Sequence, residues 1–277
     1  MKKSAQARLC LIEAAAFVLV AVFLLPVAVM AYNAFKPYSE IMSDILALPR
    51  HGTLENFVAV WTDMGVSKLF ANNLIITSIG VAGIILFASM AGYKLSRART
   101  RFSWALFLVF ILPMIIPFQT IMITVLKLAK TCGLSNSVLG LAVQYWGFGI
   151  PLAVFLYHGF VKSIPIELEE AAMLDGVSDL QAYAKIVFPL MKPITFTVVI
   201  VDVMWIWNDY LLPLVMVNSS RTTRTLTLAV YAYFGQYVSN YGYAIAALIT
   251  AVLPSVAFFL ALQKWIVKGV TAGAVKG

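Results

Sequence analysis

Six separate apolar runs dominate this sequence and limit what it can fold into. They lie at about residues 14–32, 74–93, 104–126, 138–160, 194–217 and 241–265. A run of roughly 20 apolar residues crosses the hydrocarbon core of a bilayer as an α-helix, which satisfies its own backbone hydrogen bonds. Hydrophobic residues make up 62% of the 277 residues and charged residues 12%, about half the charged fraction of a soluble domain. The sequence therefore predicts an all-α membrane protein, with six transmembrane helices in one domain over residues 1–277.

The first run follows a basic amino terminus that contains Lys2, Lys3 and Arg8. A secretory signal peptide has a similar start, and small residues near Ala28 and Ala31 imitate its cleavage site. The run is longer than the usual signal core, and several more apolar runs follow it. We therefore expect it to be retained as the first span.

Lysine and arginine are distributed unevenly between the segments that join the runs. With a cytoplasmic amino terminus, the inner segments hold 13 of the 20 cations and the outer segments hold 7. Cytoplasmic loops of membrane proteins carry an excess of such residues. We therefore expect both termini and the loop 161–193 on the cytoplasmic side of a bacterial cytoplasmic membrane. The net charge of +8 then reflects orientation in the lipid rather than a nucleic-acid partner.

Prolines interrupt the third run at Pro113 and Pro117 and the fourth at Pro151. Proline inside a span frees backbone carbonyls, so we expect kinks at these positions. Small residues within 88–92 of the second run predict close packing against another helix.

Three segments are expected on the external side of the membrane: 33–71, 127–136 and 218–240. The first contains a short amphipathic helix, on which Phe57 and Trp61 share one face that rests at the membrane interface. The last holds an aromatic group: Tyr231, Tyr233, Phe234 and Tyr237.

The polar segment 164–189, between the fourth and fifth runs, is the densest acidic cluster of the chain. It contains five of the twelve acids: Glu167, Glu169, Glu170, Asp175 and Asp179. Pro165 suits the first position of a helix, whose positive end favours the glutamates that follow. Small residues at Ala171 and Ala172 form a ridge that the surface of another protein can approach closely.

A sharp break and a second helix are predicted after this first helix. Gly176 supplies the left-handed conformation that closes a helix. Ser178, with Gln181 three residues later, forms a capping box that starts the next helix. Pro189 is expected to end it.

A spaced motif in this segment resembles the EAA loop of permease subunits from binding-protein-dependent ABC importers. It consists of Glu-Ala-Ala at 170–172, Gly176 after three further residues, Ile186 after nine more, and then Pro189. Asp175 before the glycine and the Phe-Pro-Leu sequence at 188–190 are similar to the carbohydrate-uptake, maltose-type branch. The family usually has leucine where this chain has a phenylalanine before the proline, which is a small departure.

This resemblance implies the type I ABC importer permease fold, with the loop between the fourth and fifth spans as a cytoplasmic coupling helix. It implies a second permease subunit, two ATP-binding subunits that hold ATP and Mg, and an extracytoplasmic solute-binding protein as partners. The residues that would couple to the ATPase are Glu170, Ala171, Ala172, Asp175, Gly176 and Pro189.

The sequence contains no motif of an enzyme that acts by itself. A phosphate-binding loop of the Gly-x4-Gly-Lys-Ser/Thr type does not occur. His51 and His158 are isolated, and Cys10 and Cys132 lie far apart, so we expect no metal site and no cofactor in this chain. Energy for transport is expected from a partner subunit or from an ion gradient.

The fifth run carries acidic residues that are costly inside a membrane. Asp202, Trp205 and Asp209 are spaced i, i+3 and i+7, which places them on one face of a single helix. Such a face is able to line a sugar pathway, and Trp207-Asn208-Asp209 resembles the motif of the family's fifth span. The alternative is that Asp209 fixes a helix end while Asp202 bonds to a neighbouring helix.

The favoured function is therefore a permease subunit that imports a sugar or sugar-like solute. An ion-coupled secondary transporter with Asp202 as a proton relay is the main alternative, and a non-transporting scaffold is a third. The docking pattern in 170–189 favours the importer. The sequence leaves glycerol phosphate, oligosaccharides and polyols open as solutes.

Overall fold

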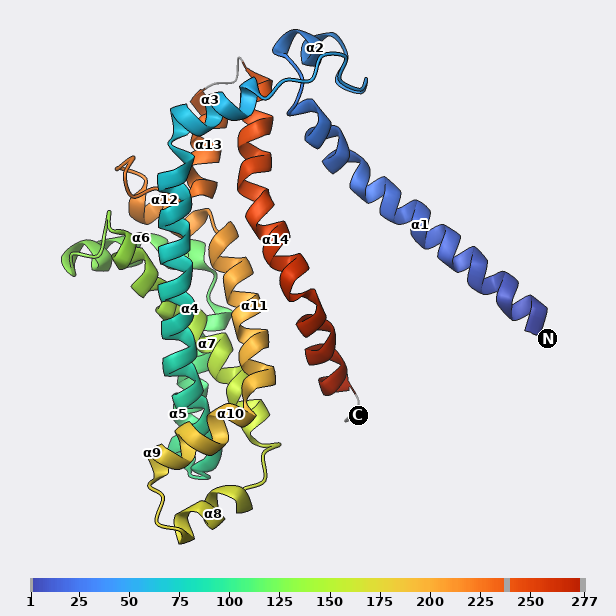
Figure 1. Cartoon of the computed structure of the whole chain (residues 1–277). Helices are drawn as coiled ribbons and strands as arrows, with labels where there is room; N and C mark the ends of the chain where they lie inside the picture. The colour runs from blue at the N-terminus through green and yellow to red at the C-terminus, as the bar shows by residue number, and fades with distance from the viewer. Residues whose placement is uncertain (1, 237–239, 275–277) are drawn as a thin grey trace. The chain divides into compact units, whose positions relative to one another are not determined.

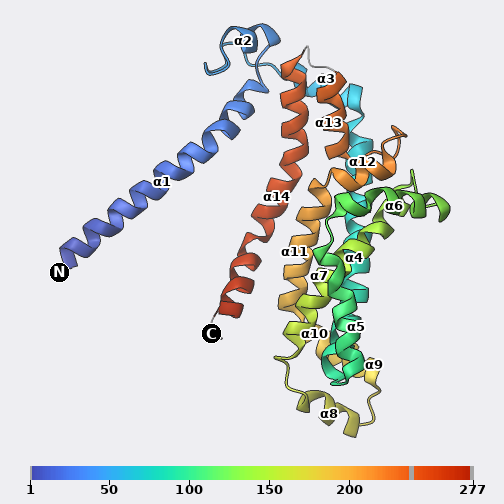
Figure 2. The ribbon, with the colours of Figure 1, turned by 180° about the vertical axis from the view of Figure 1, so that it is seen from behind.

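The computed structural model describes residues 2–236 and 240–274, and every regular element in these ranges is a helix. Tyr237 of the aromatic group and the last residues of the tail lie outside the described residues. Figures 1 and 2 show the helices from opposite sides. By its internal contacts, the chain divides into two compact units. One comprises Met1–Val66 and Ala229–Pro254, and the other comprises Ser67–Leu228 and Ser255–Gly277. We describe each unit by itself.

The first unit begins with a long apolar helix, as the sequence predicts. Its helices are α1 (Lys2–Asn33), α2 (Tyr38–Ser43) and α3 (Glu55–Met64), together with much of α13 (Leu226–Gln236) and the first part of α14 (Tyr241–Ala274). The short helix predicted in the external segment is thus confirmed as α3. It ends at Gly65, whose φ of 64° is left-handed, and α4 follows at once from Val66 rather than from about residue 74.

The segment 33–65, which we predicted to be external, is held by buried polar side chains. The Asn56 amide donates to the carbonyls of Ala34 and Lys36 at 2.9 and 2.8 Å. The ammonium of Lys36 donates to the carbonyl of Asp44 at 3.0 Å and lies 5.0 Å from the centre of the Tyr32 ring. A segment that we expected to be mostly loop is therefore folded.

The two aromatic residues of α3 have different surroundings. Phe57 packs on Phe35 with ring centres 5.0 Å apart, whereas Trp61 is 54% exposed. Their placement at a membrane interface stays a prediction.

The second unit contains the bundle that positions the acidic loop. Its helices are α4 (Val66–Arg97), α5 (Arg101–Ile111), η1 (Leu112–Ile115), α6 (Phe118–Thr131), α7 (Val138–Val161), α8 (Glu167–Leu174), α9 (Asp179–Ala182), η2 (Tyr183–Val187), α10 (Phe188–Leu190), α11 (Lys192–Asn208) and α12 (Leu211–Val217), followed by the start of α13 and the end of α14.

Helices α4 and α7 pack at the small residues that the sequence indicates. Ala88 is fully buried, and a Cβ added at Gly92 would lie 2.6 Å from the Cβ of Tyr157 and 3.0 Å from the backbone nitrogen of His158. No side chain fits there unless a helix moves. The close approach predicted for 88–92 is confirmed.

The interruption predicted in the third run is present, and it is much sharper than a kink. The run consists of two helices, 101–115 and 118–131, at an angle of 105° to each other (Figure 1). Ile116, before Pro117, is extended with a ψ of 117°, and Pro117 has no N–H to continue a helix, so the chain turns sharply here. Pro151, by contrast, lies inside α7 without interrupting it.

The fifth predicted span is also broken. Helix α11 stops at Asn208, Asp209 is extended with a ψ of 139°, and α12 resumes at Leu211. Within the described residues, four helices are long and apolar enough to cross a membrane. The number rises to six if two sharply bent pairs each count as one span: 101–115 with 118–131, and 179–190 with 192–208, which meet at 73°. The molecule is thus all-helical with four to six candidate spans.

Candidate functional site

The loop between α7 and α11 forms two helical pieces with a tight turn between them, at one end of the bundle (Figure 1). Gly176 has a φ of 83°, which confirms the predicted left-handed closure. The Gly176 N–H donates to the carbonyl of Met173 at 3.0 Å, and the Val177 N–H donates to that of Ala172 at 3.1 Å. These two bonds are the Schellman pattern that ends a helix.

The second piece starts as predicted and ends slightly later than predicted. Ser178 and Gln181 form the capping box, with the Ser178 N–H donating to the Gln181 side chain at 3.2 Å. The helix then widens into the π-helical segment η2 and closes with α10, so Pro189 lies inside its last turn rather than at its end. Single π turns of this kind are frequent at functional sites.

One side of α8 is open to solvent. Glu170 and Ala171 are exposed, as are the apolar side chains of Leu168 (45%) and Leu174 (89%). The predicted ridge is only half present, because Ala172 is buried at 8% exposure. An acidic residue beside bare apolar side chains is suited to contact with another protein.

The other side of α8 is fastened by Glu169, whose side chain is only 4% exposed. Its carboxylate accepts from Arg97 Nη2 at 2.6 Å and Nε at 2.8 Å, and from the Tyr93 hydroxyl at 2.6 Å. Arg97 Nη2 also donates to the carbonyl of Ile164 at 3.0 Å. Sequence reasoning assigned Arg97 to membrane orientation only.

The second loop piece is attached to the same helix. The hydroxyls of Tyr183 and Ser89 lie 2.7 Å apart, and the rings of Tyr183 and Tyr93 have centres 5.2 Å apart. Ser89, Tyr93 and Arg97 follow one another at intervals of four residues on α4, and we call them the α4 polar stripe. The interval of four was the available signal in the sequence.

The acidic residues of the fifth run lie at different places along the broken helix. Asp202 lies inside α11 and is buried at 3% exposure, whereas Trp205 is 38% exposed and meets the ring of Tyr145 edge-on at 5.3 Å. Asp209 lies beyond the end of the helix. The helix on which we placed the three residues thus stops just before Asp209, although Trp205 and Asp209 both contact Tyr145. Their shared face along a solute pathway stays a prediction.

Asp202 has unusual surroundings for a carboxylate. Its Oδ2 is buried and has no hydrogen-bond partner among the described residues. Asp209, in contrast, accepts from the Tyr145 hydroxyl at 2.8 Å and from the Leu211 N–H at 3.0 Å. Asn208 accepts from the Ser255 hydroxyl at 2.8 Å. Asp209 and Asn208 thus hold the broken helix in place.

Two asparagines on α4 that sequence reasoning missed hold the chain beyond the break. The Asn72 amide donates to the carbonyls of Thr222 and Arg224, both at 2.9 Å. The Asn73 amide donates to the Trp207 carbonyl at 3.3 Å, and its oxygen accepts the Leu226 N–H at 2.8 Å. Paired asparagines at the start of an apolar run were the available signal.

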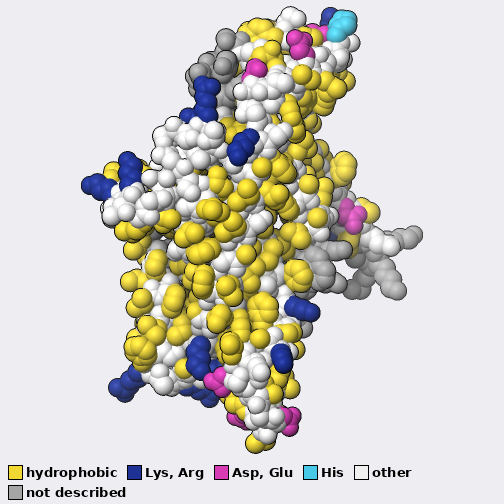
Figure 3. Space-filling view, turned by 60° about the vertical axis from the view of Figure 1, so that its left-hand side comes forward, with side chains coloured by type: hydrophobic (Ala, Val, Ile, Leu, Met, Phe, Trp, Pro, Cys, Tyr) yellow, Lys and Arg dark blue, Asp and Glu magenta, His cyan; other side chains and the backbone are white. Residues whose placement is uncertain are grey.

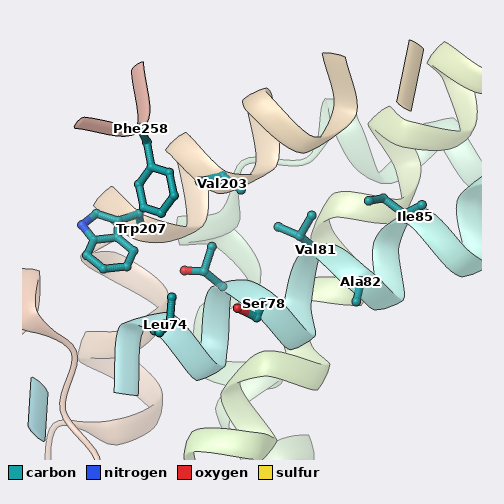
Figure 4. A pocket seen from close by; sticks show the side chains of 9 residues that line it. Leu74, Ser78, Val81, Ala82, Ile85, Val203, Trp207 and Phe258 are labelled. Carbon is teal, nitrogen blue, oxygen red and sulfur yellow. The ribbon is translucent and has the colours of Figure 1, made fainter. Parts of the chain in front are cut away.

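A cavity of about 310 Å³ lies between α4, α11 and the end of α14 (Figure 4). Its walls are mostly apolar, with Trp207 and Phe258 on one side and Val81 on another. The Trp207 indole N–H and the Thr77 hydroxyl, both in residues that line it, have no hydrogen-bond partner among the described residues. Among the described residues as a whole, no cluster of three potential metal ligands occurs.

The visible face in Figure 3 is mostly hydrophobic, while basic and acidic side chains lie together at the end that holds the α8 loop. Long apolar helices with this polar, helical loop define a multi-pass membrane protein. Comparison with known proteins gives the narrower class. The family model described as "Binding-protein-dependent transport system inner membrane component" matches residues 84–272. The chain belongs to this family.

Relatives match nearly the full length of the chain. It is 39% identical to the "Probable starch degradation products transport system permease protein" of Thermoanaerobacterium thermosulfurigenes, over 91% of both chains. It is 37% identical to the multiple sugar-binding transport system permease protein of Streptococcus mutans, over 91% of this chain and 92% of that one. The melibiose/raffinose/stachyose import permease protein of Bacillus subtilis is 36% identical, over 91% of both.

A solved structure supports the same fold. One chain of a bacterial ABC transporter involved in the import of the acidic polysaccharide alginate aligns with a TM-score of 0.79 at 19% identity, covering 94% of this chain and 97% of that one. At this identity the likeness establishes the fold alone.

Proposed function

We propose that this chain is the transmembrane permease subunit of an ATP-driven, binding-protein-dependent importer for a sugar or sugar-like solute. Family membership and the sugar-transport names of relatives at 36–39% identity support this function. The chain acts as one permease domain and forms the pathway together with a second, different permease subunit. An extracytoplasmic binding protein delivers the solute, and surrounding lipid covers the apolar helices.

The observation that carries the coupling role is the two-sided arrangement of α8. Its inner side is fixed to α4 through Glu169, while its outer side presents Glu170, Ala171 and Leu174 to solvent. Two ATP-binding subunits, which hold ATP and Mg, dock on this outer side. Asp175 and Gly176 form the turn that sets the direction of α8, and Pro189 closes the helix that returns the chain to the membrane.

A transport cycle follows from this arrangement. ATP binding closes the ATPase dimer and draws the two coupling helices together, one from each permease subunit. The solute cavity between the two permease subunits then opens to the outside of the membrane. The loop 161–193 and both termini are cytoplasmic. The pathway for the solute is lined or supported by Asp202, Trp205, Asn208 and Asp209. Trp205 supplies the exposed aromatic surface on which a sugar ring stacks.

Reconstitution tests the function directly. The chain, a second permease, the ATPase and a binding protein are assembled in liposomes, and uptake of radiolabelled oligosaccharides and polyols is measured with ATP present and ion gradients collapsed. We expect ATP-dependent uptake and ATP hydrolysis stimulated by the loaded binding protein. Uptake that strictly requires an ion gradient would support the secondary transporter instead.

Topology is tested by cysteine labelling. Cys10 and Cys132 are free and exposed, so both are first replaced by serine. A cysteine at the exposed position Ala171 is expected to react from the cytoplasmic side only, and a cysteine at the buried Ala172 serves as its matched control with slow labelling. Labelling of position 171 from the external side alone would reverse the proposed orientation.

A further inference from the structure

The α4 polar stripe ties one membrane helix to both pieces of the coupling loop. Arg97 and Tyr93 hold Glu169 in the first piece, and Ser89 contacts Tyr183 in the second. Residues at intervals of four lie on one side of a helix, so all of these contacts fall on a single line along α4. The loop is therefore attached to α4 over about two helical turns.

The contact between Arg97 and Glu169 is the strongest in the α4 polar stripe, because both side chains are largely buried. The side chains of Arg97 and Glu169 are 16% and 4% exposed, and the carboxylate receives three donors. Charge-assisted bonds of this kind are roughly twice as strong as neutral ones, and removing one partner leaves an uncompensated buried charge. Nearby, Lys94 and Asp179 form an ion pair at 3.4 Å whose side chains are 70% and 68% exposed, and such a pair contributes little.

We propose that Arg97 and Glu169 are positioning residues that make α8 and the inner end of α4 move as one body during the transport cycle. The proposal rests on the proposed coupling role of α8. Glu170 on the outer side of α8 meets the ATPase, whereas Glu169 on its inner side passes the displacement on to α4. Arg97 Nη2 also holds the carbonyl of Ile164, so the start of the loop moves with the same helix.

Charge reversal provides the first test, in the assembled importer. Arg97→Glu and Glu169→Arg, each alone, should reduce the solute imported per ATP hydrolysed by about tenfold or more, because each leaves a buried unpaired charge. The ATPase subunits should still co-purify, since the outer side of α8 is unchanged. The double variant should recover to within about threefold of the parent, as the pair is restored in reverse.

The exposed pair, which joins α4 to α9 in the same loop, supplies the control. Lys94→Glu and Asp179→Lys should each leave the transport ratio within about twofold of the parent. Single variants of the buried pair that transport like the parent would overturn the proposal, as would a double variant that inserts and assembles but stays uncoupled. Failure of the parent itself to bind the ATPase or to use ATP would instead contradict the proposed function.

A second measurement decides the matter if the charge variants do not insert. Spin labels are placed at the exposed positions Lys94 on α4 and Ala171 on α8 in a chain with serine at Cys10 and Cys132, and their separation is measured with and without ATP. One body predicts the same distance in both states. A distance that changes with ATP would show that α8 moves independently of α4 and would overturn the proposal.

Discussion

The hydroxyl of Tyr145 donates a 2.8 Å hydrogen bond to Oδ2 of Asp209, and this bond joins α7 to the residue at which α11 stops. The other oxygen of Asp209 accepts the Leu211 N–H at 3.0 Å, at the start of α12. Both oxygens of the carboxylate are thus engaged. Tyr145 is fully buried, so no water replaces its hydroxyl easily.

Tyr145→Phe should destabilise the protein by about 1–3 kcal/mol, because it leaves a carboxylate oxygen without its donor while the ring remains against Trp205. Thermal unfolding of the purified protein in detergent measures this change. Tyr241→Phe, at a residue that is 47% exposed, is the control. Equal melting temperatures for the two variants would contradict the assigned role.

Asp202→Asn should lower ATP-driven uptake only moderately. Asparagine preserves the shape and most of the hydrogen-bonding capacity of the side chain, and ATP hydrolysis should still respond to the loaded binding protein. Uptake is measured in vesicles supplied with ATP, with the proton gradient collapsed. Complete loss of uptake in this variant, together with a gradient requirement in the parent, would identify Asp202 as a proton relay.

Gly176→Leu should abolish transport while membrane insertion stays intact. The space around a Cβ at this position is open, but the φ of 83° costs an L-residue about 1–2 kcal/mol, so the turn changes its geometry and α8 its direction. Gly159→Leu is the matched control, because its Cβ would also meet open space and its φ is not left-handed. Normal uptake by the Gly176 variant would show that the turn tolerates another conformation.

Asn73→Ala should destabilise the second unit. It leaves the buried Leu226 N–H without its acceptor, which costs about 1–3 kcal/mol, while the Trp207 carbonyl loses one donor and keeps the Thr227 hydroxyl at 3.1 Å. Ser78→Ala, at an exposed position on the same helix, should change the melting temperature little. Equal shifts for the two variants would show that the asparagine bonds contribute nothing.

The segment around Glu40, between α1 and α3, should loosen in acid. The backbone N–H of Arg50, followed by the side chain of His51, lowers the pKa of the Glu40 carboxyl. Because the folded-state pKa is below the unfolded value of about 4.3, the stabilisation is complete above that value and is lost as the pH falls through the folded-state pKa.

Hydrogen exchange of the backbone amides in 44–53, corrected for intrinsic pH dependence, measures this loosening. Glu40→Gln should reproduce the acid behaviour at pH 7, since the amide carries no charge. Glu55→Gln, at an exposed residue of the next helix, should not. Protection in the Glu40 variant equal to that of the parent would contradict the prediction.

The sequence predicted those parts of the site whose signals are local. The Gly176 turn and the Ser178 cap depend on a few adjacent residues, and the structure has both. The ion pair of Arg97 with Glu169 joins residues 72 positions apart. In the sequence Arg97 is one of four closely spaced cations, and only the tertiary structure distinguishes it from Lys94.

The broken helices also show that local sequence signals do not predict features that depend on contacts with distant helices. Proline marks the turn at Pro117, although the angle of 105° depends on what each half packs against. At Asp209 no proline or glycine announces the break. The bonds from Tyr145 and Asn73 that hold this part of the chain come from distant helices, so a continuous fifth span was the natural reading of the local pattern.

The interruption after α11 raises the question of which groups accept or donate hydrogen bonds at the end of this helix when no solute is bound. A helix that stops within an apolar layer leaves carbonyl groups that lipid cannot satisfy. Here the Trp207 carbonyl already receives the Asn73 amide at 3.3 Å and the Thr227 hydroxyl at 3.1 Å. The chain itself therefore satisfies the end of α11, and no solute has to induce the interruption.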